Sequence, residues 1–150
     1  MKQLSIWTIG ISLLIGCASG LTNISWDLKP AGRPGYGYTA EDPILIGFSG
    51  DIGKNIDLSD VYLAGLRTKD DQPLHVTMRF AVKDPNHEPE YPEVLGVPMR
   101  NGSPKGGILD LYELVSTSGS DTVRLYIDIY HKDSLRVPAG LHFVPPAPSR

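Results

Sequence analysis

The chain has 150 residues, 41% of them hydrophobic and 21% charged, which is typical of one folded domain and not of a disordered chain. Its formal net charge is −3 and it has no run of Lys and Arg, so we expect no nucleic-acid partner, because phosphate binding normally needs a clustered basic face. The 16 Gly and 13 Pro favour short strands and turns over long helices.

The start of the chain has the pattern of an exported leader. Lys2 supplies a positive charge, and residues 4–16 form an apolar run of signal-peptide length. This run is shorter than a typical membrane-spanning helix. The run ends in Leu-Ile-Gly-Cys at residues 14–17, and Cys17 is the only cysteine. We therefore predict a signal peptide over residues 1–16.

This ending resembles the lipobox of bacterial lipoproteins, in which Leu stands three places before the cysteine and a small residue precedes it. The resemblance implies that Cys17 carries a diacylglycerol, that the chain is cut before it, and that the new amino terminus is acylated. The membrane is then the first expected partner, since each buried methylene contributes about 0.8 kcal/mol. An ordinary signal peptide, with Cys17 removed or left free, is the alternative.

The position after the cysteine bears on the expected compartment. Ala18 stands there in place of Asp. By resemblance to Gram-negative sorting rules, this implies the bacterial cell envelope and its outer membrane, at the periplasmic face or at the cell surface.

The next part of the chain predicts a tether and then a domain. Residues 17–40 are rich in Gly and Pro and predict a tether with an irregular entry into a β-domain at 41–144. Residues 43–48 are a short apolar run that predicts a buried strand, whereas residues 49–60 are polar with two Gly and predict a loop. The Pro-rich residues 145–150 predict an extended tail.

A first hairpin is predicted from two runs around the turn Lys-Asp-Asp-Gln. The runs are residues 61–68 and 73–82. In the second run, apolar and polar residues alternate from Leu74 to Val82, which predicts a half-buried strand. The first run also fits a short helix capped by Ser59, and this alternative stays open.

A second hairpin is predicted more clearly from residues 108–115 and 122–130, which flank a Ser-, Gly- and Asp-containing turn. Between the hairpins, the prolines of residues 83–107 predict a long loop with at most one edge segment, at Glu-Val-Leu-Gly-Val. Residues 135–144 predict a last strand or extended edge. With five to seven short strands, the expected fold is all-β, a small antiparallel β-sandwich or a barrel-like sheet.

Five motifs in fixed order, YGYTAEDPILIG, YLAGL, GGILDLYEL, VRLYIDIY and VPAGL, span about residues 36–143. They resemble a family of small bacterial lipoproteins known mainly from Bacteroidetes-type genomes, although that family often has a cysteine where this chain reads MRFAVKD. The family implies no established biochemical function. Some members bear the name of a sugar-phosphate aldolase, but a barrel aldolase needs about 200 residues and alternating strands and helices, which are not expected here.

Tyrosines and carboxylates on the second hairpin form the candidate binding site. Asp110 and Tyr112 share a face of one strand, and a second such row lies on the other strand. If the strands pair, we expect the two rows to lie side by side, joined by Arg79, as a platform for a sugar or a peptide. The alternative is that tyrosines simply cover a sheet face. The candidate residues are Arg79, Asp110, Tyr112, Tyr126, Asp128 and Tyr130.

No motif predicts a metal or a cofactor. The four histidines lack zinc-ligand spacing. His131 lies close to Asp128 and Asp133, but a turn histidine at the solvent edge is the simpler interpretation. The acidic residues between 84 and 93 lack the spacing of a calcium loop.

Three functions are compatible with these observations. The leading hypothesis is a non-enzymatic lipoprotein whose β-domain binds an envelope protein, peptidoglycan or another glycan, or has a structural role. A second is a small envelope hydrolase that uses Asp110 and Asp128. A third is an inhibitor or immunity-type lipoprotein that inserts residues 83–107 into a partner's cleft.

Overall fold

The fold is known from a computed structural model. Residues 1–24, which include the predicted signal peptide and Cys17, lie outside the described residues, as do most of the predicted loop at 83–107 and the end of the tail. Within the described parts of the chain, no helix combines the length and the apolar character needed to cross a bilayer. The described residues are 25–87, 93–94, 97–98 and 107–145.

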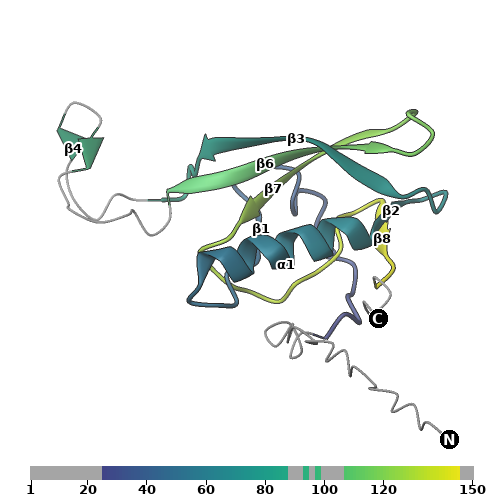
Figure 1. Ribbon diagram of the computed structural model, residues 1–150, viewed down its shortest axis with the longest axis horizontal. Helices are drawn as coiled ribbons and strands as arrows, with labels where there is room; N and C mark the ends of the chain where they lie inside the picture. Colours follow the sequence, from purple (N-terminus) through teal and green to yellow (C-terminus); the bar gives the residue numbers. More distant parts are fainter. Residues whose placement is uncertain (1–24, 88–92, 95–96, 99–106, 146–150) are drawn as a thin grey trace, which may run out of the picture.

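A four-stranded sheet is the centre of the fold (Figure 1). Its strand order is β1-β7-β6-β3. β6 pairs antiparallel with both β3 and β7, whereas β1 pairs parallel with β7. The strands are β1 (Ile44–Leu45), β3 (Leu74–Lys83), β6 (Ile108–Ser116) and β7 (Thr122–Asp128).

The β6–β7 hairpin confirms the clearest sequence prediction. Its turn closes where the backbone N–H of Ser116 donates to the carbonyl of Asp121, at 2.9 Å. Leu125 and Ile127 are fully buried on one face of β7, and Arg124 is exposed on the other. The alternation of apolar and polar residues therefore identified the buried face of this strand correctly.

The first predicted hairpin is wrong in its pairing. β3 pairs with β6, whereas β2 (Leu66–Thr68) pairs antiparallel with β8 (Leu141–Phe143) in a separate two-stranded sheet. The predicted turn does form, because the N–H of Thr68 donates to the carbonyl of Gln72, but only an isolated bridge links Arg67 with Pro73. Two further short strands, β4 (Glu93–Val94) and β5 (Val97–Pro98), pair with each other near the predicted edge segment.

The predicted loop over residues 49–60 is wrong, because most of it belongs to the helix α1 (Ile52–Gly65). Asp51 is the N-cap that precedes the helix, and its carboxylate accepts a hydrogen bond from the N–H of Gly53 at 2.9 Å. The alternative of a helix near residue 61 is thus correct in type but not in its start. Ser59 does not cap the helix; it is buried inside it and donates to the carbonyl of Asn55.

The core lies between α1 and one face of the four-stranded sheet (Figure 1). Phe143 of β8 stacks on Tyr62 of α1, with ring centroids 5.9 Å apart, and on Trp26, at 5.3 Å. Trp26 belongs to the segment predicted as a tether. The described part of that segment, residues 25–40, therefore contributes to the packing of the core. The buried core residues include Tyr36, Ile44, Ile46, Leu58, Tyr62, Leu63, Leu66, Leu114, Leu125, Ile127 and Val137.

These elements confirm the predicted all-β class. The described residues are mostly β, with one four-stranded sheet, the two-stranded sheets β2-β8 and β4-β5, and one short helix, and the fold is sandwich-like. No closed barrel forms among the residues that the structure describes. Of the two predicted forms, the sandwich therefore applies.

The prediction of a half-buried strand over residues 73–82 is wrong for most of β3. Leu74 is buried, but the strand is exposed from His75 to Ala81. The physical reason is position, because β3 is the last strand of its sheet and α1 covers only one face.

The end of α1 provides a stability test. A Cβ added at Gly65 would lie 2.6 Å from Cζ of Phe143, whose ring is held between Tyr62 and Trp26 and cannot move away easily. We expect Gly65→Ala to lower the free energy of unfolding by about 2 kcal/mol, as in overpacked cores, despite the higher helix propensity of Ala. Gly50→Ala is the control, because no atom lies within 4 Å of its added Cβ. Equal denaturant midpoints for the two variants would contradict this account.

Candidate functional site

The register of the β6–β7 ladder separates the predicted site residues. Asp110 lies opposite Ile127, and Tyr112 lies opposite Leu125. Directly paired residues share a face, so Asp110 and Tyr112 point to the α1 side with the buried core, whereas Tyr126 points to the other side. The prediction that the Asp110 row and the Tyr126 row lie side by side on one face is therefore wrong. The ladder is offset by one residue from the register that would place both rows on that face.

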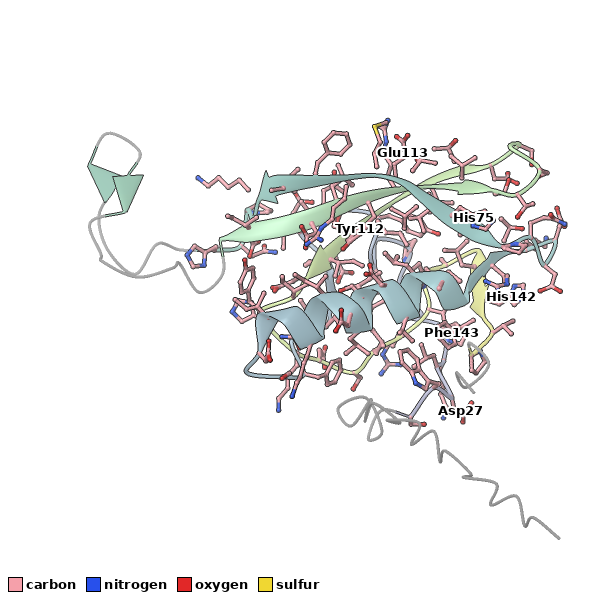
Figure 2. The ribbon with its side chains drawn as sticks, viewed as in Figure 1. Asp27, His75, Tyr112, Glu113, His142 and Phe143 are labelled. Carbon is pink, nitrogen blue, oxygen red and sulfur yellow. The ribbon has the colours of Figure 1, made fainter. Side chains whose placement is uncertain are left out.

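One part of the predicted group does come together around Tyr112, which lies between the sheet and α1 (Figure 2). Arg79 of β3 makes two hydrogen bonds with Asp110, from Nε to Oδ1 at 3.0 Å and from Nη2 to Oδ2 at 2.8 Å. Its guanidinium carbon lies 5.5 Å from the centre of the Tyr112 ring, in cation–π range. Arg79 thus joins Asp110 and Tyr112, but it does not join them to the row on β7.

The charges in this cluster are balanced internally. The hydrogen bond with Asp110 raises the pKa of Arg79, which keeps the guanidinium charged. Burial raises the pKa of Tyr112 to about 12; Arg79 partly offsets the effect, whereas Asp110 and Asp60 add to it. Tyr112 Oη is buried and has no hydrogen-bond partner among the described residues. The cluster therefore holds a neutral phenol beside a closed ion pair. This arrangement is typical of a structural cluster and not of groups that act as a general acid or base.

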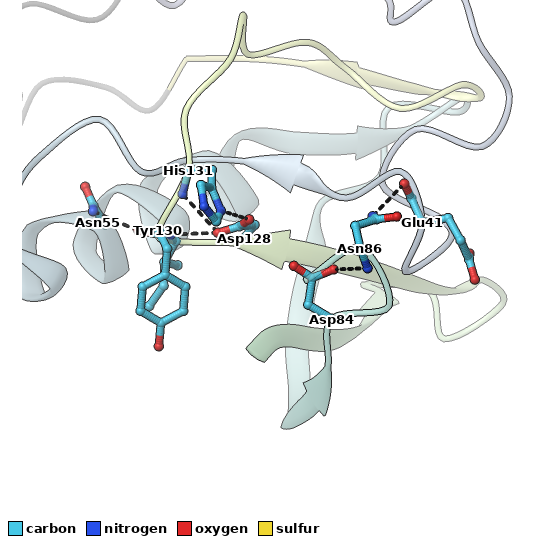
Figure 3. A network of polar contacts seen from close by, with 8 residues as sticks. Glu41, Asn55, Asp84, Asn86, Asp128, Tyr130 and His131 are labelled. Carbon is cyan, nitrogen blue, oxygen red and sulfur yellow. Dashed lines mark hydrogen bonds and ion pairs between the residues drawn. The ribbon is translucent and has the colours of Figure 1, made fainter. Parts of the chain in front are cut away.

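The other predicted residues lie at the end of β7 (Figure 3). Asp128 is buried, and its Oδ1 accepts hydrogen bonds from the backbone N–H groups of Tyr130, at 2.7 Å, and His131, at 3.0 Å. Its Oδ2 lies 2.7 Å from Nδ1 of His131. Asp128 consequently builds the turn that ends the strand.

The chain approaches this turn closely at Gly47. Its N–H donates to the carbonyl of His131 at 2.7 Å, and a Cβ at Gly47 would lie 2.6 Å from the backbone nitrogen of His131. Only glycine permits this approach without a shift of the backbone.

A pocket of about 340 Å³, with several charged residues in its lining, lies beside the turn. On its far side Asp84 is buried, and its Oδ1 accepts from the N–H of Asn86 at 2.9 Å, while Asn86 Nδ2 donates to the carbonyl of Glu41 at 3.0 Å (Figure 3). No three His, Cys, Asp or Glu side chains within the described ranges are placed to hold a metal ion. The pocket is lined by Arg33, Glu41, Asp42, Pro43, Leu45, Asp84, Asn86, His87, Asp128 and His131.

Most of this pocket could not be found from the sequence. Asp128 and His131 are close in the chain, and their proximity was visible, but Arg33, Asp84 and His87 come from segments that only the fold brings together. No spacing rule connects them.

In comparisons with known proteins, no family model matches this chain, and neither a curated protein nor a solved structure does. The resemblance to small lipoproteins therefore stays a prediction.

Tyr112→Phe tests the buried hydroxyl. Because an unpaired buried hydroxyl is unfavourable, we expect the variant at pH 7 to match the wild type or to gain up to about 1 kcal/mol in unfolding free energy. The wild type should lose stability as the pH rises from 10 towards 12, since Tyr112 ionises first in the unfolded chain. Denaturant unfolding across this range should show a smaller loss for the variant. A variant clearly less stable at pH 7 would mean that Oη has a partner.

Asp128→Ala tests the turn. The substitution leaves two backbone N–H groups without their carboxylate, and hydrogen bonds to charged groups contribute about 1.5–3 kcal/mol each, so we expect a loss of about 3 kcal/mol in unfolding free energy. Asp128→Asn keeps an oxygen for both N–H groups and should lose about 1 kcal/mol. Asp121→Ala, at an exposed carboxylate in the β6–β7 turn, is the control and should change stability by less than about 0.5 kcal/mol. Similar midpoints for Asp128→Ala and Asp121→Ala would refute this role.

Proposed function

We propose that this protein is a lipid-anchored bacterial envelope protein whose β-domain binds a partner protein and has no hydrolytic activity of its own. Support for the anchor comes from the lipobox-like sequence at residues 14–17 and from the lone Cys17. Support for binding comes from a single structural observation. Three large apolar side chains of β3, those of Val76, Met78 and Phe80, remain 45%, 47% and 47% exposed. Exposed apolar side chains gathered on one strand are typical of an interaction surface.

The hydrolase alternative is weakened by the two carboxylates on which it depends. A pair that cleaves a glycosidic bond must face one substrate. Asp110 is closed in an ion pair with Arg79 on the α1 side, and the carboxylate of Asp128 is occupied by the turn at the end of β7. Neither is available as a free acid or base.

A protein partner is favoured over a glycan. The aromatic platform expected for a sugar needed Tyr112 beside Tyr126, and the register points these residues to opposite faces. The inhibitor alternative depends on residues 83–107, most of which lie outside the described ranges, and it stays a prediction.

The anchor is tested by mass spectrometry of the full-length chain purified from membranes with detergent. We expect an amino-terminal Cys17 carrying a diacylglycerol and an amide-linked acyl chain, and Cys17→Ser should move the protein to the soluble fraction. An unmodified chain that still begins at Met1, recovered from the cytosol, would refute the anchor.

The binding role is tested by chemical cross-linking of the anchored protein in intact cells, followed by identification of cross-linked proteins. We expect one envelope protein to be cross-linked reproducibly, and Asp110→Asn should not abolish this. Failure of the wild type to cross-link any envelope protein would contradict the proposed function.

A further inference from the structure

β3 is an open edge of the four-stranded sheet. It pairs with β6 on one side, and no strand of the described chain continues the ladder on the other. Every residue from His75 to Ala81 is exposed. The strand is ten residues long, whereas many natural edge strands are kept very short. Its free backbone N–H and C=O groups can therefore pair with another extended chain.

Exposed apolar side chains lie on both faces of this edge. Phe80 lies opposite Leu111, on the side away from α1, and Val76 lies opposite Leu114, on the α1 side. A β-bulge between Val76 and Met78 shifts the register, so neighbouring apolar residues of the strand reach different faces. An added strand would cover apolar side chains on both faces at once.

A groove runs beside the first part of this edge. It has a volume of about 460 Å³ and lies between the C-terminal half of α1 and the start of β3. Its apolar side chains come from both elements, and Asp60, Arg67 and His75 are its charged or titratable members. Extended peptides bind to several protein domains in this way, by adding a strand to a sheet edge while their side chains enter neighbouring pockets. The groove is lined by Asp60, Leu63, Ala64, Arg67, Pro73, Leu74, His75 and Val76.

The charges along the edge indicate the occupant. β3 carries two basic side chains, Arg79, whose charge is paired with Asp110 of β6, and Lys83, and it has no carboxylate of its own; Arg67 adds a cation at the groove. Asp60 is the one carboxylate in the groove lining. A second copy of β3 would bring the same cations and no opposite charge, whereas a segment with Asp or Glu would be complementary.

We propose that β3 binds an extended, acidic segment of a partner protein as a fifth strand, with some of its side chains seated in the groove beside α1. This inference deepens the proposed function and rests on it. Apolar residues of the segment contact Val76 and the groove, and its carboxylates face Arg67 and Lys83, the two cations that are not paired with Asp110.

The test uses the full-length chain in detergent and two ten-residue probe peptides. One alternates Val and Thr with Glu, and the other has Lys in place of every Glu. We expect the Glu peptide to bind with a Kd at least tenfold lower than the Lys peptide, and to shift the NMR amide signals of residues 75–81. Binding of neither peptide at 1 mM, equal binding of both, or signal changes confined to the pocket at Asp128 would overturn the proposal.

Two matched variants place the binding on β3. Val76 and Ile52 are 45% and 46% exposed, but only Val76 lies on the edge and in the groove. We expect Val76→Glu to weaken binding of the Glu peptide at least tenfold, and Ile52→Glu to leave it unchanged. Equal effects of the two variants would overturn the proposal. So would a concentration-dependent dimer in sedimentation that Val76→Glu dissociates, because the occupant would then be a second copy.

The cell cross-linking experiment separates this inference from the proposed function. If wild type and Val76→Glu cross-link the same envelope protein equally well, the role of β3 is refuted and the binding function stands. If the wild type cross-links none while the Glu peptide still binds β3, the envelope function fails and the strand-addition site stands.

Discussion

The seating of α1 on the sheet depends on the buried amide of Asn55. Its Oδ1 accepts from the N–H of Ser49 at 2.8 Å, and its Nδ2 donates to the carbonyls of Ser49 and Ile129, each at 2.9 Å. One side chain thus connects the start of the helix to the segment before it and to the chain that follows β7. At the other end, the absence of a side chain at Gly65 admits the ring of Phe143. Held at both ends, α1 covers one face of the sheet and leaves the edge at β3 open.

This arrangement separates the polar groups into structural and accessible ones. The ion pair of Arg79 with Asp110 and the turn built by Asp128 both satisfy buried carboxylates, which would otherwise be costly. These are the groups that a hydrolase would need to keep free. What stays accessible is an uncovered strand with apolar side chains, and the proposed binding role rests on that surface.

Local pattern predicted some elements well and missed one for a physical reason. The hairpin of β6 and β7 was predictable because its apolar residues alternate and its turn residues lie between them. The helix α1 was not, because Gly, Asn and Asp in residues 49–60 are poor helix formers in isolation. Its stability comes from the Asp51 cap and from Leu58 and Tyr62, which are buried only when the sheet is present.

The sequence by itself determined which residues of β6 and β7 share a face, the all-β class, and the prediction of a lipid anchor at Cys17. It also predicted that Asp110, Tyr112 and Arg79 belong to one cluster, and in the structure Arg79 contacts both of the other residues. Only the tertiary structure decided that Tyr126 lies on the opposite face, because a shift of one residue in register reverses the side to which a side chain points. It also decided that β3 is an edge. Alternation identifies the residues of a face, but whether another element covers that face depends on the packing of the whole chain.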